Sequence, residues 1–291
     1  MTEPTVFEGG VSGLAGLLRA ALPSLPLVNQ LPGIRKTGDG PEGLAFTRPK
    51  VAVDPQHVAA YARVCEFPRK ETLPLTYPHM LAFPLHMAIM TSPDFPYPAI
   101  GTVHLENSIK ATRPIGLHER LNVTVRTGPE RAHAKGRMVD FHASVQSEDE
   151  TVWESTSTYL RLGRGDDSAP AGLAVPEAPE ATIQWQLPAD LGRSYAAVSG
   201  DHNPIHLYPL TAKALGFPRQ IAHGMWSLAR CVAAVENRLP DAVQVDVAFK
   251  KPILLPGTVG FGQRRDGADL AFALANPRDG APHLVGIATP A

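Results

Sequence analysis

Apolar residues repeat with a helical period in the later part of the chain. One face of the predicted helix is apolar, and several neighbouring positions are apolar too, so the helix should be buried. Gly224 stands just before this segment, and Pro240-Asp241 ends it. The residues that fall largely on its apolar face are Met225, Leu228, Ala229, Val232 and Leu239.

Downstream of this helix the period changes to two, which is typical of half-buried strands. Leu254-Leu255-Pro256-Gly257 reads as a turn between two of the strands. The pattern therefore predicts a helix followed by several antiparallel strands. The alternating apolar positions are Val243, Val245, Val247 and Phe249, then Val259 and Phe261, then Leu270, Phe272 and Leu274, and last Leu284, Val285 and Ile287.

The first half of the chain follows the same plan. A helix-like segment begins near Val53, a second reads F-P-L-H-M-A-I-M, and strands follow. Tyr61 aligns with Tyr195, and Arg113-Pro114-Ile115 aligns with Lys251-Pro252-Ile253. A repeat of this length indicates duplication of one supersecondary unit. We expect an α+β fold in which a buried helix wrapped by an antiparallel sheet occurs twice.

A run rich in proline, glycine and aspartate, G-R-G-D-D-S-A-P-A-G-L-A-V-P-E-A-P, separates the halves and is typical of a linker. We predict four segments along the chain. They are an N-terminal extension at 1–45, a first domain at 46–163, the linker at 164–180 and a second domain at 181–291.

Composition narrows the class of protein. The 291 residues are 44% hydrophobic and 19% charged, with a formal net charge of −1, so charge gives no case for nucleic acid or an anionic membrane as partner. Cys65 and Cys231 lie far apart and make no disulfide framework or zinc motif. The chain has no signal-like start and no apolar run of about 18 residues. We expect a cytoplasmic protein.

Chemistry concentrates at residues 199–206, S-G-D-H-N-P-I-H. Asp201 and His206 are five positions apart, a spacing that a turn into a helical segment can bring together. Pro204 and Asn203 are residues that shape such a loop. A carboxylate and an imidazole that converge on one water make a general acid–base pair. A polar turn is the alternative for each residue alone, and D-x-N-x-x-H supplies too few ligands for zinc, so we expect no metal.

These residues also resemble a known family. Y-x-x-V-S-G-D-x-N-P-I-H, from Tyr195 to His206, looks like the signature of the MaoC-like, or hydratase 2, enzymes. The resemblance continues through G-F-P-R-Q-I-A-H-G-M and F-K-K-P-I-L-L-P-G. The family's fold is the hotdog, a sheet curled around one long helix, so two copies resemble its double-hotdog members. L-T-Y-P-H-M-L-A-F-P-L-H in the first half is similar to the N-terminal half of bacterial dehydratases that act on acyl thioesters.

The resemblance implies reversible hydration of trans-2-enoyl thioesters, or dehydration of (3R)-hydroxyacyl thioesters, in fatty-acid metabolism and without a cofactor. Asp201 and His206 would be the acid–base pair, with their separate duties open. The thioester oxygen gains charge during the reaction, and the Gly224 N–H at a helix start would stabilise it. Some members carry a serine two turns into that helix, where this chain has Val232.

The first half has no matching motif, since A-R-V-C-E-F-P-R-K follows Tyr61. That half is expected to bind the acyl chain instead. We expect His202 to be exposed, and His79 and His86 to be packing or interface residues. The residues expected to bind substrate are Ser199, Gly200, Asn203 and His223 in the loop and helix entry, with Arg219, Lys250 and Lys251 as candidates for phosphate contacts.

Two other classes remain open. Hotdog folds also host thioesterases, and fold does not fix function. A non-catalytic subunit that binds acyl thioesters is the third possibility. The expected partner is an acyl thioester of coenzyme A or of acyl carrier protein, with no nucleic acid and no membrane, and the chain is expected to be a monomer or a homodimer.

Overall fold

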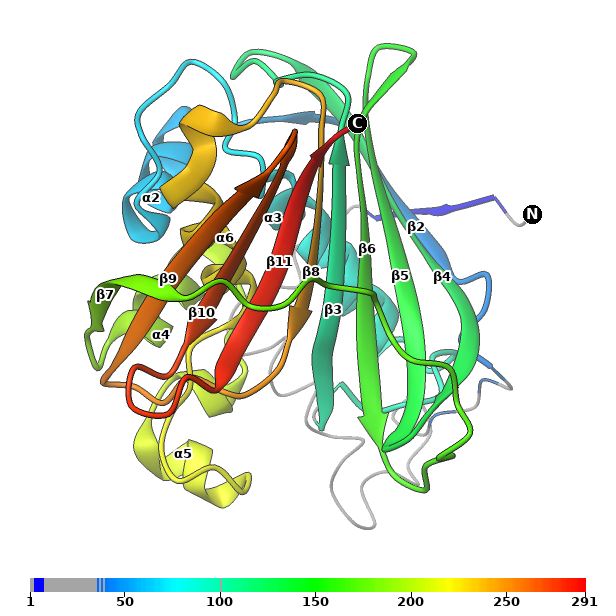
Figure 1. The fold of residues 1–291 in the computed structure, drawn as a ribbon. Coiled ribbons are helices and arrows are strands. Elements are labelled where there is room, and N and C mark those ends of the chain that lie inside the picture. Colours follow the sequence, from blue (N-terminus) through cyan, green and yellow to red (C-terminus); the bar gives the residue numbers. More distant parts are fainter. Residues whose placement is uncertain (1–2, 8–35, 37, 39, 100) are drawn as a thin grey trace.

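The computed structural model describes residues 3–7, 36, 38, 40–99 and 101–291, and most of the expected N-terminal extension at 1–45 lies outside them. The described residues form one eleven-stranded sheet with helices against it (Figure 1). The strands are β1 (Thr5–Val6), β2 (Ala45–Ala52), β3 (Thr102–Ala111), β4 (Arg120–His133), β5 (Gly136–Ser147), β6 (Glu150–Leu162), β7 (Ala181–Leu187), β8 (Val243–Phe249), β9 (Gly257–Asp266), β10 (Asp269–Ala275) and β11 (Pro282–Pro290). The helices are α2 (Pro55–Cys65), α3 (Pro78–Thr91), α4 (Leu191–Ser199), α5 (Pro209–Ala214) and α6 (Gly224–Val235), with 3₁₀ turns η3 (Pro204–His206) and η4 (Glu236–Arg238).

The sheet consists of two five-stranded units in mirrored order, β2-β4-β5-β6-β3 and β8-β11-β10-β9-β7. When the strands of each unit are numbered in chain order, both units have the spatial order 1-3-4-5-2. This shared topology confirms the predicted duplication. The units join through β3 and β8, which pair antiparallel from Glu106 opposite Ala248 to Ala111 opposite Val243. The short β1 is added parallel to β2 at one edge.

Equivalent hydrogen bonds in the two units support the internal repeat. The Leu73 N–H donates to the Ile115 carbonyl at 2.8 Å, and the Ala222 N–H donates to the Ile253 carbonyl at 2.9 Å. Each bond ties the segment before the unit's long helix to its Arg-Pro-Ile or Lys-Pro-Ile segment. The alignment of these two tripeptides from sequence is therefore confirmed.

Local sequence explains where the helices begin and end. The Asp54 side chain accepts a hydrogen bond from the Gln56 N–H at 2.9 Å, and Pro55 follows the cap, as helix N-termini favour. Helix α6 begins at Gly224 as predicted but ends at Val235. The prediction extended the helix to Pro240-Asp241. In the structure the residues after Val235 form the 3₁₀ turn η4, and such turns are frequent at helix ends.

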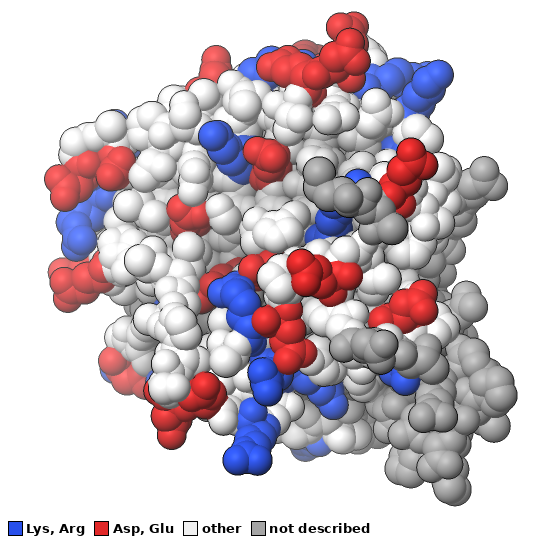
Figure 2. Space-filling model, turned by 90° about the vertical axis from the view of Figure 1, so that its right-hand side faces the viewer, with Lys and Arg blue, Asp and Glu red and all other residues white. Residues whose placement is uncertain are grey.

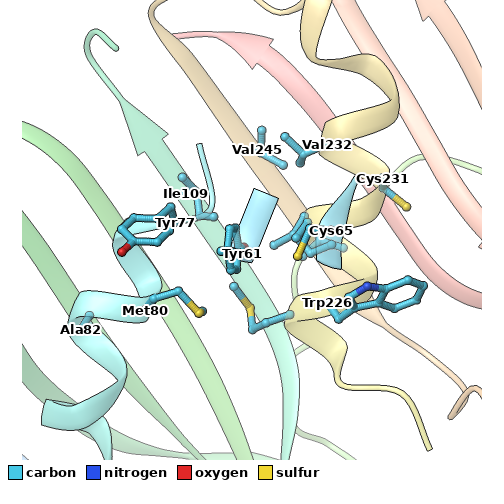
Figure 3. Close-up of a cluster of buried hydrophobic side chains, with 14 of the residues drawn as sticks. Tyr61, Cys65, Tyr77, Met80, Ala82, Ile109, Trp226, Cys231, Val232 and Val245 are labelled. Carbon is cyan, nitrogen blue, oxygen red and sulfur yellow. The ribbon is translucent and has the colours of Figure 1, made fainter. Parts of the chain in front are cut away.

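The helices α3 and α6 are buried. The helices α2 and α3 of the first unit pack against α4 and α6 of the second, and Figure 3 shows buried side chains of this region. The rings of Tyr61 and Tyr195, the residues aligned by the repeat, lie 6.3 Å apart between centroids. The Trp226 Nε1–H of the second unit donates to the Val64 carbonyl of the first at 3.1 Å. The two units therefore share one continuous core, which fixes the helix α6 relative to the first unit.

The linker between β6 and β7 crosses the face of the sheet opposite the helices (Figure 1). The Leu173 N–H anchors it by donating to the Glu106 carboxylate at 2.7 Å. Figure 2 shows acidic and basic side chains interspersed on the face that it views, in keeping with the small net charge. Among the described residues, no helix is both long and apolar enough to cross a membrane.

Candidate functional site

The loop that follows α4 is shaped by its own side chains. Gly200 ends the helix with φ of +74°, a left-handed conformation that favours glycine. The Asp201 N–H then donates to the Ser199 Oγ at 3.1 Å. The Asp201 Oδ1 accepts the Asn203 N–H at 3.1 Å, which closes an Asx turn. These bonds fix the position of the Asp201 carboxyl group.

The 3₁₀ turn η3 begins at Pro204 and carries His206 into the interior, where it is 8% exposed. The Ile221 N–H donates to the Ile205 carbonyl at 3.0 Å and holds the turn in place. The His206 Nδ1 lies 2.8 Å from the Ile221 carbonyl oxygen. Because a carbonyl only accepts, Nδ1 carries the proton, and Nε2 of the neutral ring has a free lone pair.

His223, the residue before α6, connects this loop to the helix. Its Nε2–H donates to the Asp201 carbonyl at 3.0 Å and lies 3.8 Å from the Asp201 Oδ2. Its ring stacks on His206 with centroids 3.7 Å apart. The Nδ1 atom is buried without a hydrogen-bond partner among the described residues. His223 thus holds both Asp201 and His206 in place.

The protonation states follow from this packing. Burial lowers the pKa of His206, and the Asp201 carboxylate opposes that effect. Burial and the neighbouring His206 lower the pKa of His223 to about 3. Burial opposes the charged form of Asp201, but both histidines and the Asn203 N–H outweigh it and lower the pKa of Asp201. At neutral pH the site therefore holds a carboxylate beside neutral imidazoles.

The same three residues are also a group that could hold a metal ion. Asp201, His206 and His223 each offer a ligand atom within 4.8 Å of the others, which reaches the minimum of three for a catalytic zinc. However, the His206 Nδ1 and the His223 Nε2 both point at backbone carbonyls. The nitrogen of His223 that lies nearest the carboxylate is therefore already a hydrogen-bond donor, and the geometry fits an acid–base site better than a metal.

Gly224 places the start of α6 at this site. The first backbone N–H groups of a helix have no carbonyl partner within it, and the helix dipole favours negative charge there. A Cβ at Gly224 would lie 3.2 Å from the Phe249 ring, closer than side chains normally approach. Glycine therefore leaves room beside the Phe249 ring for a substrate atom to reach the N–H.

A cavity of about 1180 Å³ extends from this site into the first unit. Apolar side chains from α3, β3 and β6 line its far part. Part of the linker, residues 171–175, also lines it. The apolar residues from the first unit are Met80, Phe83, Met87, Met90, Val103, Leu105, Leu160 and Leu162.

The structure brings together nearly all of the site residues predicted from sequence. Those that line the cavity are Ser199, Gly200, Asp201, Asn203, His206, His223, Gly224, Lys250 and Lys251. Arg219 is exposed and does not line the cavity. The expectation that His202 is exposed was wrong, because the residue is half-buried, lines the cavity and donates from Nδ1 to the Gly200 carbonyl at 3.0 Å.

Sequence reasoning missed several polar residues of the cavity. His104 and Tyr159 come from the strands β3 and β6, and Tyr195 comes from α4. His79 was expected to be a packing or interface residue, but it lines the cavity, whereas His86 is fully buried as packing. These residues come from separate strands and helices, so no local spacing in the sequence marked them.

Two hotdog-like units with this loop and helix entry define a recognisable class. The family description "MaoC like domain" matches residues 171–273. The chain is 39% identical over 291 residues, covering 98% of both chains, to "3-hydroxyacyl-thioester dehydratase X" of Mycobacterium tuberculosis. The chain therefore belongs to the MaoC-like family.

Solved structures confirm the double-hotdog architecture. The crystal structure of HtdX from Mycobacterium tuberculosis has a TM-score of 0.76 at 36% identity, covering 85% of this chain and 100% of that one. Another Mycobacterium tuberculosis protein, described as a double hotdog fold, has a TM-score of 0.56 at 12% identity over 86% of this chain and 96% of that one. The second likeness concerns the fold alone.

Proposed function

We propose that the chain is a hydro-lyase that interconverts (3R)-hydroxyacyl thioesters and trans-2-enoyl thioesters in fatty-acid metabolism. The observation that carries this proposal is the proximity of three groups. Asp201, the free Nε2 of His206 and the N-terminus of α6 at Gly224 line one cavity. General acid–base catalysis needs the first two groups, and stabilisation of an enolate-like oxygen needs the third.

In the hydration direction, the water oxygen bonds to C3 and one of its protons ends on C2. The Asp201 carboxylate and the neutral His206 both accept hydrogen bonds, so together they can orient one water and remove its proton. The protonated member of the pair then delivers a proton to C2. The thioester oxygen bears the negative charge in between, and the Gly224 N–H donates to it.

The two units take different parts of the substrate in this proposal. The catalytic unit at 181–291 holds the thioester, and the apolar lining from the unit at 46–163 holds the acyl chain. Lys250 and Lys251 at the cavity are placed to meet the phosphates of coenzyme A or of a carrier protein. A cytoplasmic location, and a monomer or homodimer as the oligomeric state, stay predictions.

The Mycobacterium tuberculosis protein that matches along the whole chain is called a 3-hydroxyacyl-thioester dehydratase, and this name supports the proposed hydro-lyase activity. The test is hydration of crotonyl-CoA and longer enoyl-CoA substrates, followed by loss of the absorbance of the conjugated thioester. The product must be the (3R)-hydroxyacyl thioester. Release of free thiol would indicate a thioesterase, and binding without turnover would indicate a non-catalytic subunit; either result overturns the proposal.

A further inference from the structure

The first unit contributes a second group of histidines to the cavity. His79 on α3 and His104 on β3 both line it, with ring centroids 6.4 Å apart. His79 is only 2% exposed, and its Nδ1 has no hydrogen-bond partner among the described residues. The His104 Nε2 is likewise buried and has no hydrogen-bond partner in the part of the chain that the structure describes. Neither ring belongs to the acid–base pair of the second unit.

These histidines are neutral at physiological pH. Burial lowers the pKa of His79 to about 4 and that of His104 to about 3, while the Asp201 carboxylate acts in the opposite direction on both. They therefore offer hydrogen bonds and not charge to whatever lies beside them. A buried polar atom without a partner is destabilising, so a chain made only of hydrocarbon is a poor occupant at this point.

The state of His104 indicates which group fits. Burial is the main cause of the lowered pKa of His104, and the Glu106 backbone acts in the opposite direction. The Nε2 atom of the neutral ring is buried without a hydrogen-bond partner among the described residues, and it can accept or donate one bond according to the tautomer. Its natural partner is a hydroxyl group, which can both donate and accept and so has capacity left for His79.

Aromatic contacts place the His104 ring near the reacting part of the substrate. The His104 ring stacks on Tyr159 with centroids 4.7 Å apart and lies 5.1 Å from the Phe249 ring. Phe249 is the ring that a Cβ at Gly224 would meet. The Phe249 ring therefore contacts both His104 and the position of Gly224, whose N–H is the proposed oxyanion donor.

We propose that His79 and His104 form a binding site for a hydroxyl group on the acyl chain, beyond the reacting carbons. The substrates would then be acyl thioesters that carry an additional hydroxyl group, and the two histidines would determine specificity. This inference rests on the proposed function, since it concerns the acyl part of the same substrate.

The test compares plain trans-2-enoyl-CoA substrates with chain-matched substrates that carry one hydroxyl group at successive carbons beyond C3. Wild-type enzyme is expected to have a kcat/KM about tenfold higher for at least one hydroxylated isomer than for its plain counterpart. His104→Phe and His79→Phe should abolish this preference. His104→Gln should retain part of it, because the glutamine amide still bonds to a hydroxyl.

His86→Phe is the matched control. His86 is also a buried histidine of α3, and its Nε2 has no partner among the residues described. Its Nδ1 lies 3.2 Å from the Tyr159 hydroxyl, and the residue does not line the cavity. This variant should change the thermal unfolding temperature and leave the preference intact. The inference is overturned by a wild-type enzyme that prefers every plain substrate, or by Phe variants that change plain and hydroxylated substrates equally. Absence of hydration with all substrates would instead refute the proposed function.

Discussion

The ring of His206 stacks on the ring of His223, with their centroids 3.7 Å apart. The two residues come from different elements, since His206 ends η3 and His223 precedes α6. The same His223 donates to the Asp201 carbonyl at 3.0 Å. A single side chain thus couples the loop that carries the acid–base pair to the helix start that carries the oxyanion donor.

Replacing His223 should therefore impair catalysis through position. His223→Phe keeps a ring under His206 but loses the N–H that holds Asp201. A displacement of the Asp201 carboxylate by about 1 Å should lower kcat about a hundredfold. KM should change little, because the apolar lining from the first unit and the lysines at 250 and 251 are unchanged in this variant. His142→Phe, at an exposed histidine outside the cavity, is the control. A kcat of His223→Phe equal to wild type would show that the coupling has no role.

Gly224 should tolerate a methyl group only if Phe249 is made smaller. Gly224→Ala puts a Cβ 3.2 Å from the Phe249 ring and is expected to lower kcat/KM about tenfold or more by crowding the oxyanion position. The double variant Gly224→Ala with Phe249→Leu should recover part of that loss. Steady-state kinetics of both variants and of Phe249→Leu alone measure the coupling. Strictly additive effects would contradict the proposed contact.

Stability should fall in mild acid before carboxylates begin to protonate. His79, His104 and His223 have folded-state pKa values of about 4, 3 and 3, below the unfolded value of about 6.5. The unfolded chain then binds more protons, so the stability present above pH 6.5 is lost as pH falls below it. Each histidine should contribute about 1 kcal/mol per pH unit in this range. Urea unfolding at pH 7 and pH 5 measures the change, which His104→Phe should reduce.

Lys250 and Lys251 should act on the carrier and not on the chemistry. Both are exposed residues at the cavity, and each Lys→Ala change should raise KM for an enoyl-CoA about twofold to fivefold with little change in kcat. A truncated pantetheine thioester without phosphates should show no such effect. Arg219→Ala, outside the cavity, should have a smaller effect than either lysine variant. An equal rise in KM for both substrates would exclude phosphate recognition.

The sequence contained enough information for the repeat and the catalytic loop because both are local patterns. The spacing of Asp201 and His206 and the glycine before α6 lie in contiguous segments whose turn chemistry is readable. The convergence of His79 and His104 was not predictable, since a helix and a distant strand bring them together. Their environment also depends on the pairing of β3 with β8 and on Phe249. Contacts across the unit boundary leave no spacing signal in the chain.

The most direct test of the account is the turnover of Asp201→Asn and His206→Gln on a trans-2-enoyl-CoA. Both replacements keep the side-chain size close to the original and remove the proton-transfer group. We predict that each lowers kcat by about a hundredfold to ten thousandfold, with unchanged thermal unfolding and retained substrate binding. Hydration at wild-type rates by both variants would contradict the assignment of this pair as the acid–base catalyst.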